Sequence, residues 1–377
     1  MILPDATLGV LGGGQLGRLF TMAAHSMGYR VVVLDPDPHS PAGLIADQHI
    51  QSAYSDHAAL QMMADECSAI TTEFENVPAE ALHYLEQRCL VRPDARSLAV
   101  AQDRIREKTY VSHCGLNTAA FFAVYEASDI EENIHTLSPP MLLKTASMGY
   151  DGKGQIRVSN LQEAIEAFEE LGKQPCVLEE MVDLECEISV LLARSVTGEA
   201  AVYPVGENLH INGILDTTIV PARLDPVVLD GAVDMAAELA EKLDYVGMLA
   251  VEFFFTRQGD LLINEIAPRP HNSGHYTLDA TVTSQFEQQV RTLCGLPPGD
   301  TMLLSPVVMV NILGDIWGSE PPPWEKLLKR PRCKLHLYGK HEARPGRKMG
   351  HFNCLSSDLE SALQLAEAVR HDIASGK

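Results

Sequence analysis

Lys144-Thr145-Ala146-Ser147-Met148-Gly149-Tyr150-Asp151-Gly152-Lys153-Gly154-Gln155 is a glycine-rich segment between two predicted strands. The apolar run Met141-Leu142-Leu143 predicts a buried strand with Lys144 at its end, and a second strand starts at Ile156. Glycines lack a Cβ and can bring backbone N–H groups close to a ligand. The segment therefore predicts a loop that folds over a polyphosphate, with amides and lysines as ligands. A hairpin turn with exposed lysines is the alternative, and a Walker A motif is excluded because no Gly-Lys-Ser/Thr ending opens a helix.

Composition limits the class of protein and its partners. The chain has 377 residues, enough for roughly two to three domains, and 46% of them are apolar. There are 51 acidic and 29 basic residues, and the formal charge of −22 argues against nucleic acid and anionic membranes as partners. Eight cysteines without a Cys-x-x-Cys pair predict reduced thiols in a cytoplasmic protein. Asp5 interrupts the apolar start, so we expect neither a signal peptide nor a membrane span.

The first residues predict a βαβ unit of a parallel sheet. Thr7 to Leu11 is typical of a buried strand, Gly12 to Gly17 matches Gly-x-Gly-x-x-Gly, and an amphipathic helix follows up to Gly28. Asp35 comes after the second strand, Val31 to Leu34, as in dinucleotide-binding folds. The pattern favours the fold more than the cofactor, because similar turns bind other phosphates or only pack tightly. Binding of nicotinamide or flavin stays open as an alternative.

Helices and strands keep alternating up to about residue 117, where we place the first domain boundary. Ala69 to Phe74 predicts a strand, and Glu73 and Glu75 lie at its end, where ligands gather in open parallel sheets. Solvated loop acids would give the same pattern. Ala95 to His113 predicts one long helix, and we expect most of its charges to form a solvated face: Arg104, Arg106 and Lys108.

Beyond residue 117 the pattern changes to α+β with an antiparallel sheet. Strands are predicted at Cys176 to Val182 and at Glu185 to Ala193, without a helix between them. A helix from about Leu278 to Cys294 is followed by Gly295 to Gly299, which is typical of a connector. We therefore expect three domains, at residues 1–117, 118–299 and 300–377.

Two apolar strands, Leu249 to Phe255 and Leu261 to Ile266, each contain one acid. If the turn residues between them form a four-residue loop, Thr256 pairs with Leu261, and Glu252 faces Glu265 on one side of the sheet. Facing carboxylates repel each other and are costly to bury, which favours a divalent cation between them. Oxygen ligands indicate Mg²⁺, with Mn²⁺ as a second candidate. The alternatives are a buried acid paired with a basic residue, or a register that separates the acids.

The chain leaves this hairpin through Ala267-Pro268-Arg269-Pro270-His271-Asn272-Ser273-Gly274-His275. The two prolines stiffen the backbone, so Arg269 and His271 should be held in fixed positions. With Asn272 beside the acids, these side chains predict a cradle for a small planar oxyanion. A structural loop with a capping histidine is the alternative.

A local excess of basic residues marks the last part of this acidic chain. Lys340, Arg344, Arg347 and Lys348 lie close together in the sequence. The cluster predicts an anion site, although a basic run is often only a solvated loop.

Together these parts resemble the ATP-grasp superfamily and, within it, the N5-carboxyaminoimidazole ribonucleotide synthetases of purine biosynthesis. The similarity covers essentially the whole chain, and its most specific part is Asn264 to His275. Its other parts are Gly12 to Arg18, Thr72 to Val77, Gly149 to Gln155 and Tyr338 to His351. The resemblance implies an α/β and α+β protein of ATP-grasp architecture, with an N-terminal Rossmann-like (pre-ATP-grasp) domain, a two-lobed ATP-grasp domain and a small C-terminal domain.

By matching position, the resemblance implies roles for individual residues. Binding of ATP falls to Arg104, Lys144, Gly149, Tyr150, Asp151, Gly152, Lys153, Gly154, Gln155, Glu179, Glu180, Met181, Val182, Glu187, His210, Asn264 and Glu265. The resemblance implies that Glu252 and Glu265 bind the metal. It implies that aminoimidazole ribonucleotide is bound by Gln15, Glu73, Tyr150, Asp151, Lys340 and Arg347. It implies catalytic roles for Lys153, Arg269, His271 and Asn272.

The implied reaction is the ATP-dependent carboxylation of 5-aminoimidazole ribonucleotide with bicarbonate, through carboxyphosphate, by a homodimer. One departure concerns Ala267, because many superfamily members have asparagine there; metal binding should then depend more on the two glutamates. Three other functions stay open. They are a formate- or amino-acid-activating ligase, an NAD-linked oxidoreductase built on the first βαβ unit, and a nucleotide-sensing module without turnover.

Overall fold

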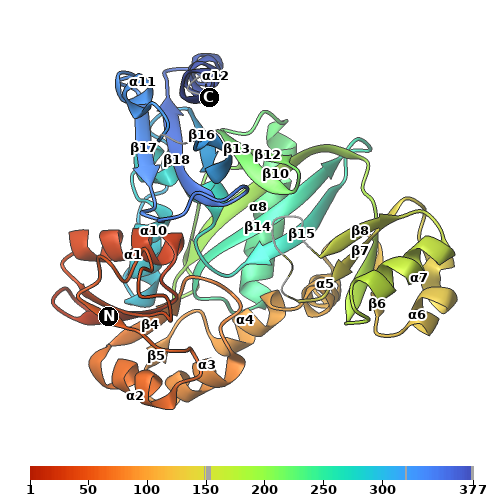
Figure 1. The fold of residues 1–377 in the computed structure, drawn as a ribbon, viewed down its shortest axis with the longest axis horizontal. Helices are drawn as coiled ribbons and strands as arrows, with labels where there is room; N and C mark the ends of the chain where they lie inside the picture. Colours follow the sequence, from red (N-terminus) through yellow and green to blue (C-terminus); the bar gives the residue numbers. More distant parts are fainter. Residues whose placement is uncertain (148, 150–153, 319–320, 375–377) are drawn as a thin grey trace.

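The computed structural model describes residues 1–147, 149, 154–318 and 321–374. These residues form three sheets, which Figure 1 shows as an N-terminal part, a small lobe on the opposite side, and a large sheet between them that continues into the C-terminal part. Among the described residues, no helix has both the length and the apolar composition that a membrane span requires.

The N-terminal sheet is parallel, with strand order β3-β2-β1-β4-β5, which confirms the predicted βαβ unit. Helices cover it, so alternate residues of its central strand join two different cores. Its strands are β1 (Thr7–Leu11), β2 (Arg30–Leu34), β3 (Gln48–Ile50), β4 (Ala69–Thr72) and β5 (Leu90–Val91). Its helices are α1 (Gln15–Ser26), α2 (His57–Glu66) and α3 (Ala79–Glu86).

The single helix predicted at Ala95 to His113 is wrong. The structure has two helices, α4 (Ala95–Ala101) and α5 (Arg104–His113). Asp103 starts the second one, because its carboxylate accepts the backbone N–H of Arg106 at 2.9 Å. The break directs α5 toward the small lobe and the large sheet (Figure 1). Of the charges predicted on a solvated face, Arg106 is exposed, but Arg104 is partly buried and Lys108 is only 2% exposed.

The small lobe is an antiparallel sheet in the order β6-β9-β7-β8, covered by two helices (Figure 1). Its strands are β6 (Phe121–Val124), β7 (Met141–Thr145), β8 (Gln155–Val158) and β9 (Cys176–Glu180), and its helices are α6 (Ala127–Asn133), η1 (Ile134–Thr136) and α7 (Leu161–Glu170). As predicted, β7 delivers Lys144, which pairs with Gln155 across the glycine-rich segment. Residues 148 and 150–153 of that segment lie outside the described residues.

The large sheet has nine strands in the order β15-β14-β10-β12-β13-β16-β18-β17, with β11 beside β10. Its members are β10 (Leu184–Arg194), β11 (Ala200–Val202), β12 (Gly206–Ile211), β13 (Ile214–Val220), β14 (Gly247–Thr256), β15 (Leu261–Ala267), β16 (Val307–Leu313), β17 (Cys333–Leu337) and β18 (Lys348–Leu355). Because β16 pairs with β13, the C-terminal strands extend the central sheet.

Helices of different lengths surround the large sheet. They are α8 (Pro226–Lys242), η2 (Asn272–Gly274), α9 (Thr277–Ala280), α10 (Gln285–Leu293), η3 (Gly314–Ile316), α11 (Trp324–Leu328) and α12 (Leu359–Ala374). The helix predicted from Leu278 to Cys294 is therefore two helices. Ser284 caps the second one by accepting the backbone N–H of Glu287 at 3.1 Å.

Candidate active site

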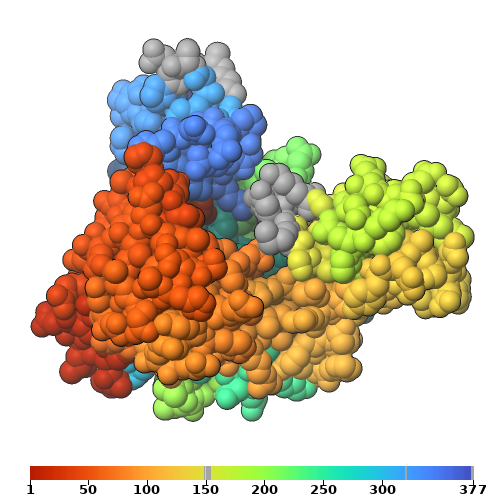
Figure 2. Space-filling view, turned by 60° about the horizontal axis from the view of Figure 1, so that its bottom comes forward, coloured from red at the N-terminus to blue at the C-terminus, as the bar shows by residue number. Residues whose placement is uncertain are grey.

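A cavity of about 900 Å³ lies where the three sheets meet. Its walls come from the glycine turn after β1, from α5, β7, β10, β12, β14 and β15, and from the segment between β17 and β18. Figure 2 shows the surface hollowed between the N-terminal part (red to orange) and the C-terminal part (blue). This volume is at the upper end of ordinary small-molecule sites, and so it has room for more than one substrate.

The hairpin of β14 and β15 brings the two acids predicted to bind metal, Glu252 and Glu265, opposite each other. Its turn differs from the prediction, because Leu261 pairs with Phe255 rather than with the residue after it. A β-bulge with Asn264 as the extra residue reverses this displacement, and the two acids come into register. Both Asn264 and Glu265 line the cavity.

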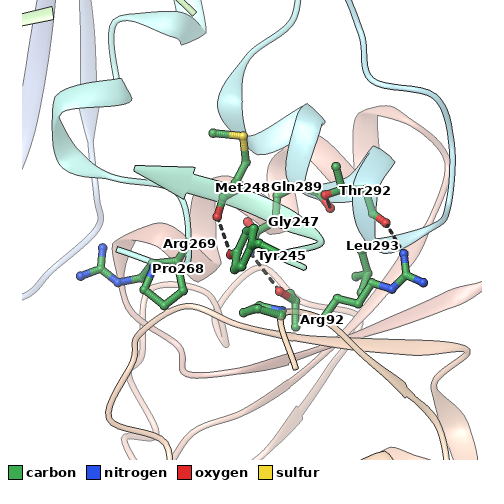
Figure 3. A pocket seen from close by; sticks show the side chains of 11 residues that line it. Arg92, Tyr245, Gly247, Met248, Pro268, Arg269, Gln289, Thr292 and Leu293 are labelled. Atoms are coloured by element: carbon green, nitrogen blue, oxygen red, sulfur yellow. Dashed lines mark hydrogen bonds between the residues drawn. The ribbon is translucent and has the colours of Figure 1, made fainter. Parts of the chain in front are cut away.

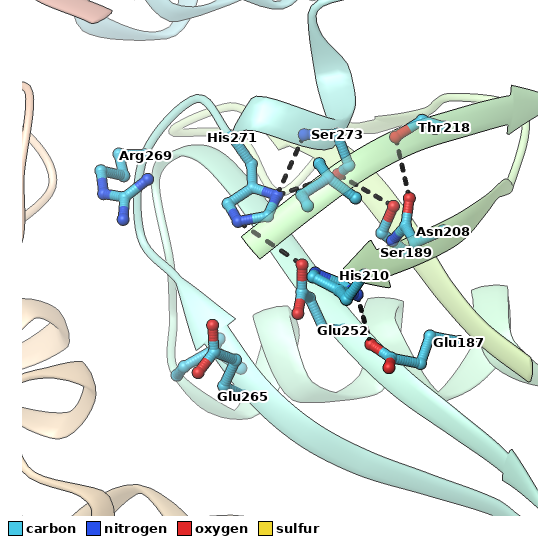
Figure 4. A network of polar contacts seen from close by, with 12 residues as sticks. Glu187, Ser189, Asn208, His210, Thr218, Glu252, Glu265, Arg269, His271 and Ser273 are labelled. Atoms are coloured by element: carbon cyan, nitrogen blue, oxygen red, sulfur yellow. Dashed lines mark hydrogen bonds and ion pairs between the residues drawn. The ribbon is translucent and has the colours of Figure 1, made fainter. Parts of the chain in front are cut away.

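The acids on the cavity floor lie close to one another, and Glu252 is the buried one. Burial, followed by the Glu265 carboxylate, raises the pKa of Glu252 to about 8. Glu187 and His210 lie beside it, and these three residues offer ligand atoms within 4.8 Å of one another (Figure 4). Burial lowers the pKa of His210, but the carboxylates of Glu187, Glu252 and Glu265 outweigh this and raise it overall. The site thus carries more negative charge than its own histidine balances.

A polar cradle follows β15. The Nε of Arg269 donates to Oε2 of Glu75 at 2.6 Å, and the ring Nε2 of His271 lies 3.5 Å from Oε1 of Glu252. Burial and the nearby Arg269 hold the pKa of His271 well below its usual range, so the ring is neutral. The side-chain amide of Asn272 is buried and has no hydrogen-bond partner among the described residues. Figure 4 shows Arg269 and His271 on the side of the network away from Glu187.

Helix α5 connects the large sheet to the small lobe. Arg104 donates to Oε2 of Glu265 at 3.2 Å, and Lys108 lies 3.1 Å from Oε2 of Glu179 on β9. The other oxygen of Glu179 lies 3.1 Å from Nζ of Lys144. Burial lowers the pKa of Lys144, while the Glu179 carboxylate opposes this. Glu179 therefore holds two lysines in place, one of which lines the cavity.

The carboxylates of two acids accept hydrogen bonds from the backbone N–H groups of the N-terminal glycine turn. The N–H of Gly13 donates to Asp35 at 2.6 Å, and the N–H groups of Gly14 and Gly17 donate to the Glu73 carboxylate, the latter at 2.7 Å. In a dinucleotide-binding turn these amides would face a pyrophosphate, and the acid after the second strand would hold a ribose. The glycine motif here serves packing and the capping of α1, which counts against the oxidoreductase alternative.

At the basic end of the cavity, residues from the N-terminal and C-terminal parts of the chain contact each other. Nζ of Lys340 donates to Oε1 of Gln15 and to the carbonyl of Lys348, each at 2.7 Å. Arg347 lies next to it and donates to the carbonyl of Glu342 at 2.9 Å. Because these cations line the same cavity as the acids of the floor, the predicted anion site is part of the same cavity.

A second, much smaller cavity lies between β4, β14 and α10 (Figure 3). Its lining includes Arg92, Tyr245 and Gln289, and its accessible space is about 10 Å³. That space suits about one water molecule and no substrate. The guanidinium of Arg269 points away from this cavity (Figure 3), consistent with its place in the main one.

Comparison with known proteins adds the family. The ATP-grasp domain family matches residues 109–286, the ribonucleotide synthetase preATP-grasp domain matches residues 5–102, and the phosphoribosylaminoimidazole carboxylase C-terminal domain matches residues 307–365. The N5-carboxyaminoimidazole ribonucleotide synthase of Bacillus subtilis is 43% identical over 365 residues, which cover 97% of this chain and 95% of that protein. The chain belongs to the N5-carboxyaminoimidazole ribonucleotide synthase family. This family consists of ATP-grasp ligases, which confirms the fold and the enzyme class predicted from the sequence.

Solved structures of the synthase family agree with this placement. The ADP complex of an N5-carboxyaminoimidazole ribonucleotide synthetase is 44% identical, has a TM-score of 0.92, and covers 99% of each chain. The Aspergillus clavatus synthase, in complex with ADP and 5-aminoimidazole ribonucleotide, is 28% identical, with a TM-score of 0.90 over 99% of each chain. The three sheets of the fold therefore have the same arrangement as in these synthases.

The structure brings most of the predicted site residues to this one cavity. Those that line it are Gln15, Glu73, Arg104, Lys144, Gly149, Gln155, Glu187, His210, Glu252, Asn264, Glu265, Arg269, His271, Asn272, Lys340 and Arg347. Tyr150, Asp151, Gly152 and Lys153 lie outside the described residues. Residues predicted for ATP but not among the lining residues are Gly154, Glu179, Glu180, Met181 and Val182.

Sequence reasoning missed two residues that shape the candidate site. Glu107 lines the cavity and is 3% exposed, and burial with the nearby Glu265 raises its pKa to about 8. Gln285 holds the backbone of His271 with both atoms of its amide, at 2.9 and 2.8 Å. The position of Glu107 three residues after Arg104 on one helix was a usable signal. Nothing in the sequence marked Gln285.

The residues on the cavity floor fit a divalent cation. The carboxylates of Glu252 and Glu265 face each other across the hairpin, and Asn264 adds an amide beside them. Burial, followed by the neighbouring Glu265 carboxylate, raises the pKa of Glu252, and a bound cation would offset both effects. Such oxygen donors are typical of Mg²⁺ sites, which use one or two carboxylates together with substrate phosphates.

Proposed function

We propose that this chain carboxylates 5-aminoimidazole ribonucleotide with bicarbonate, using ATP, to give N5-carboxyaminoimidazole ribonucleotide, ADP and phosphate. The observation that carries the proposal is that one cavity joins three groups. These are the facing acids Glu252 and Glu265, the cradle of Arg269 with the unpartnered Asn272, and the basic end at Lys340. A triphosphate, a small oxyanion and a phosphorylated substrate each find a complementary group there.

We propose that ATP lies between the small lobe and the large sheet. Lys144 and Arg104 face its phosphates, and Glu187 and His210 lie where the ribose would be. Mg²⁺, held by Glu252 and Glu265 with Asn264, would neutralise charge on the γ-phosphoryl group. Tyr150 to Lys153 and Glu179 to Val182 stay predicted ATP ligands. The arrangement of Lys108, Lys144 and Glu179 supports a role for Glu179 in positioning Lys144.

In the first step, an oxygen of bicarbonate attacks the γ-phosphorus, the bond to ADP breaks, and carboxyphosphate forms. Arg269 and the free amide of Asn272 hold the carboxylate during this transfer, and the neutral ring of His271 lies beside it. In the second step, the exocyclic amine forms a bond to the carboxyl carbon, either of carboxyphosphate or of the CO₂ that it releases; phosphate leaves, and the amine loses its proton. Lys340 and Arg347 hold the 5′-phosphate of the ribonucleotide, with Gln15 and Glu73 at the same end.

Phosphate release tests this function. ATP and Mg²⁺ are supplied with bicarbonate alone, with the ribonucleotide alone, and with both. We expect rapid release only when both are present, together with a product that carries carbon from bicarbonate. Release that depends on formate or an amino acid would favour another ligase, and ATP binding without any release would favour a nucleotide sensor.

We also propose that the enzyme works as a cytoplasmic homodimer, that Mn²⁺ can replace Mg²⁺, and that the chain divides into domains at residues 1–117, 118–299 and 300–377. The family matches at 5–102, 109–286 and 307–365 support that division. The exchange of metals is tested by phosphate release with each ion. Light scattering at several protein concentrations tests the dimer, and a monomer mass at all of them would contradict it.

A further inference from the structure

Helix α5 presents three charged side chains to the large sheet and the small lobe: Arg104, Glu107 and Lys108. Arg104 and Lys108 have roles in the proposed function, as partners of Glu265 and Glu179. Glu107, between them, is 3% exposed and has no role in that function. Burying a carboxylate is costly unless it makes a strong bond, so its partner is informative.

The partner of Glu107 is the backbone of β15, the strand that contains Asn264 and Glu265. The N–H of Ile266 donates to Oε1 of Glu107 at 2.6 Å. Ile266 directly follows Glu265 and faces Val251 in the hairpin, but its N–H points out of the ladder toward α5. Glu265 and Ile266 are thus held by one helix, the first through its side chain and the second through its main chain.

This part of β15 needs such support for two reasons. The strand is at the edge of the large sheet, so its outward N–H groups have no ladder partner. It also contains the bulge at Asn264, which leaves an interruption in the pairing with β14. The carbonyl of Asn117 accepts the N–H of Ile263 on one side of the bulge, and Glu107 accepts that of Ile266 on the other.

We propose that Glu107 is a positioning residue for the metal and ATP site. Its hydrogen bond to Ile266 fixes the bulge, and the bulge sets Asn264 and Glu265 against Glu252. The inference rests on the proposed function for its meaning in catalysis, but the bond and its effect on metal binding can be measured without turnover.

Three variants separate the hydrogen bond from the charge. Glu107→Gln keeps an oxygen acceptor of the same reach and removes the charge. Glu107→Asp keeps the charge on a side chain too short to reach Ile266, and Glu107→Leu removes both. The matched control is Glu86→Leu, because Glu86 accepts the N–H of Ala95 at the same 2.6 Å and does not line the cavity.

Two readouts are independent of turnover. The first is amide hydrogen exchange of the segment 261–267 in the ligand-free protein. The second is the affinity for Mn²⁺ with ADP, by electron paramagnetic resonance. Loss of the acceptor leaves the buried N–H of Ile266 unsatisfied, which should weaken Mn²⁺·ADP binding roughly 10- to 100-fold and speed exchange at Ile266.

We expect the Leu and Asp variants to lose protection and affinity, and the Gln variant and Glu86→Leu to stay within about threefold of wild type. In turnover, the loss should appear in kcat and in the Mg²⁺ requirement, with an unchanged KM for the ribonucleotide. Wild-type behaviour of Glu107→Asp, or equal losses in the Gln and Leu variants, would overturn the proposal. If the Leu variant does not fold, the contrast between Gln and Asp decides. If wild-type turnover does not depend on bicarbonate, the proposed function fails while these binding results still stand.

Discussion

Replacing Lys340 with alanine removes a cation from the basic end of the cavity and tests where the ribonucleotide binds. In the structure its Nζ is held between Oε1 of Gln15 and the carbonyl of Lys348, each at 2.7 Å. The ammonium is therefore fixed before the substrate arrives. A hydrogen bond to a charged group contributes about 1.5–3 kcal/mol, so the KM for the ribonucleotide should rise roughly 10- to 150-fold. The KM for ATP should change less than about twofold, because the proposed ATP site lies at the other end of the cavity.

Initial rates of phosphate release measure both constants, with one substrate varied and the other two saturating. Lys334→Ala is the control, since Lys334 is an exposed lysine on β17 that does not line the cavity. Thermal unfolding of each variant shows whether the fold survives. An equal rise in the two KM values, or the same rise in the control, would refute the assignment of Lys340 to the phosphate.

Three further predictions concern charge. Burial and Glu265 raise the pKa of Glu252 to about 8, so the metal-free protein should lose stability as the pH rises from about 5 to 8. The loss in the free energy of unfolding is on the order of 4 kcal/mol at most, and Glu252→Gln should reduce it. Urea unfolding at several pH values measures this loss. A pH dependence of stability that the variant leaves unchanged would contradict the assignment. Glu179→Leu leaves Lys108 and Lys144 buried without their counter-charge and should cost about 3–5 kcal/mol in the same assay, whereas a cost below about 1 kcal/mol would count against the pairing. Arg269→Lys should raise the KM for bicarbonate roughly tenfold or more with little effect on that for ATP, because lysine lacks the planar fork of arginine; similar changes in both would argue against the cradle.

The facing acids show what the sequence could predict and where its limit lies. Apolar alternation and turn residues predicted that Glu252 faces Glu265, and the structure confirms this pairing. The predicted turn was wrong by one residue, and the bulge at Asn264 compensated for that error. A bulge depends on what supports the strand from outside, here Glu107 on a helix more than 150 positions earlier. Local pattern contains no such information.

Helix α5 shows the same limit for charged side chains. A run with Arg104 and Lys108 is typical of a solvated helix face, yet Lys108 is buried against Glu179 of the small lobe. The partner comes from a strand that the sequence places far away. A break at Asp103 was readable as an N-cap, and it is the feature that directs α5 to the cavity.

The glycine turn shows why a motif predicts a fold better than a ligand. Gly12 to Gly17 correctly predicted the βαβ unit. The same pattern would suit a dinucleotide. However, Asp35 and Glu73 accept the hydrogen bonds of the backbone N–H groups that such a ligand would need. Only the positions of these two acids in space, one from each neighbouring strand end, distinguish the two outcomes.

The most direct test of the facing-acid site is phosphate release by Glu265→Gln at saturating ATP, Mg²⁺, bicarbonate and ribonucleotide. The variant keeps the size of the side chain and removes one of the two charges that would hold the metal. We predict that turnover is abolished while thermal unfolding stays close to that of the wild type. Turnover near the wild-type rate in the folded variant would contradict a metal site built on Glu252 and Glu265.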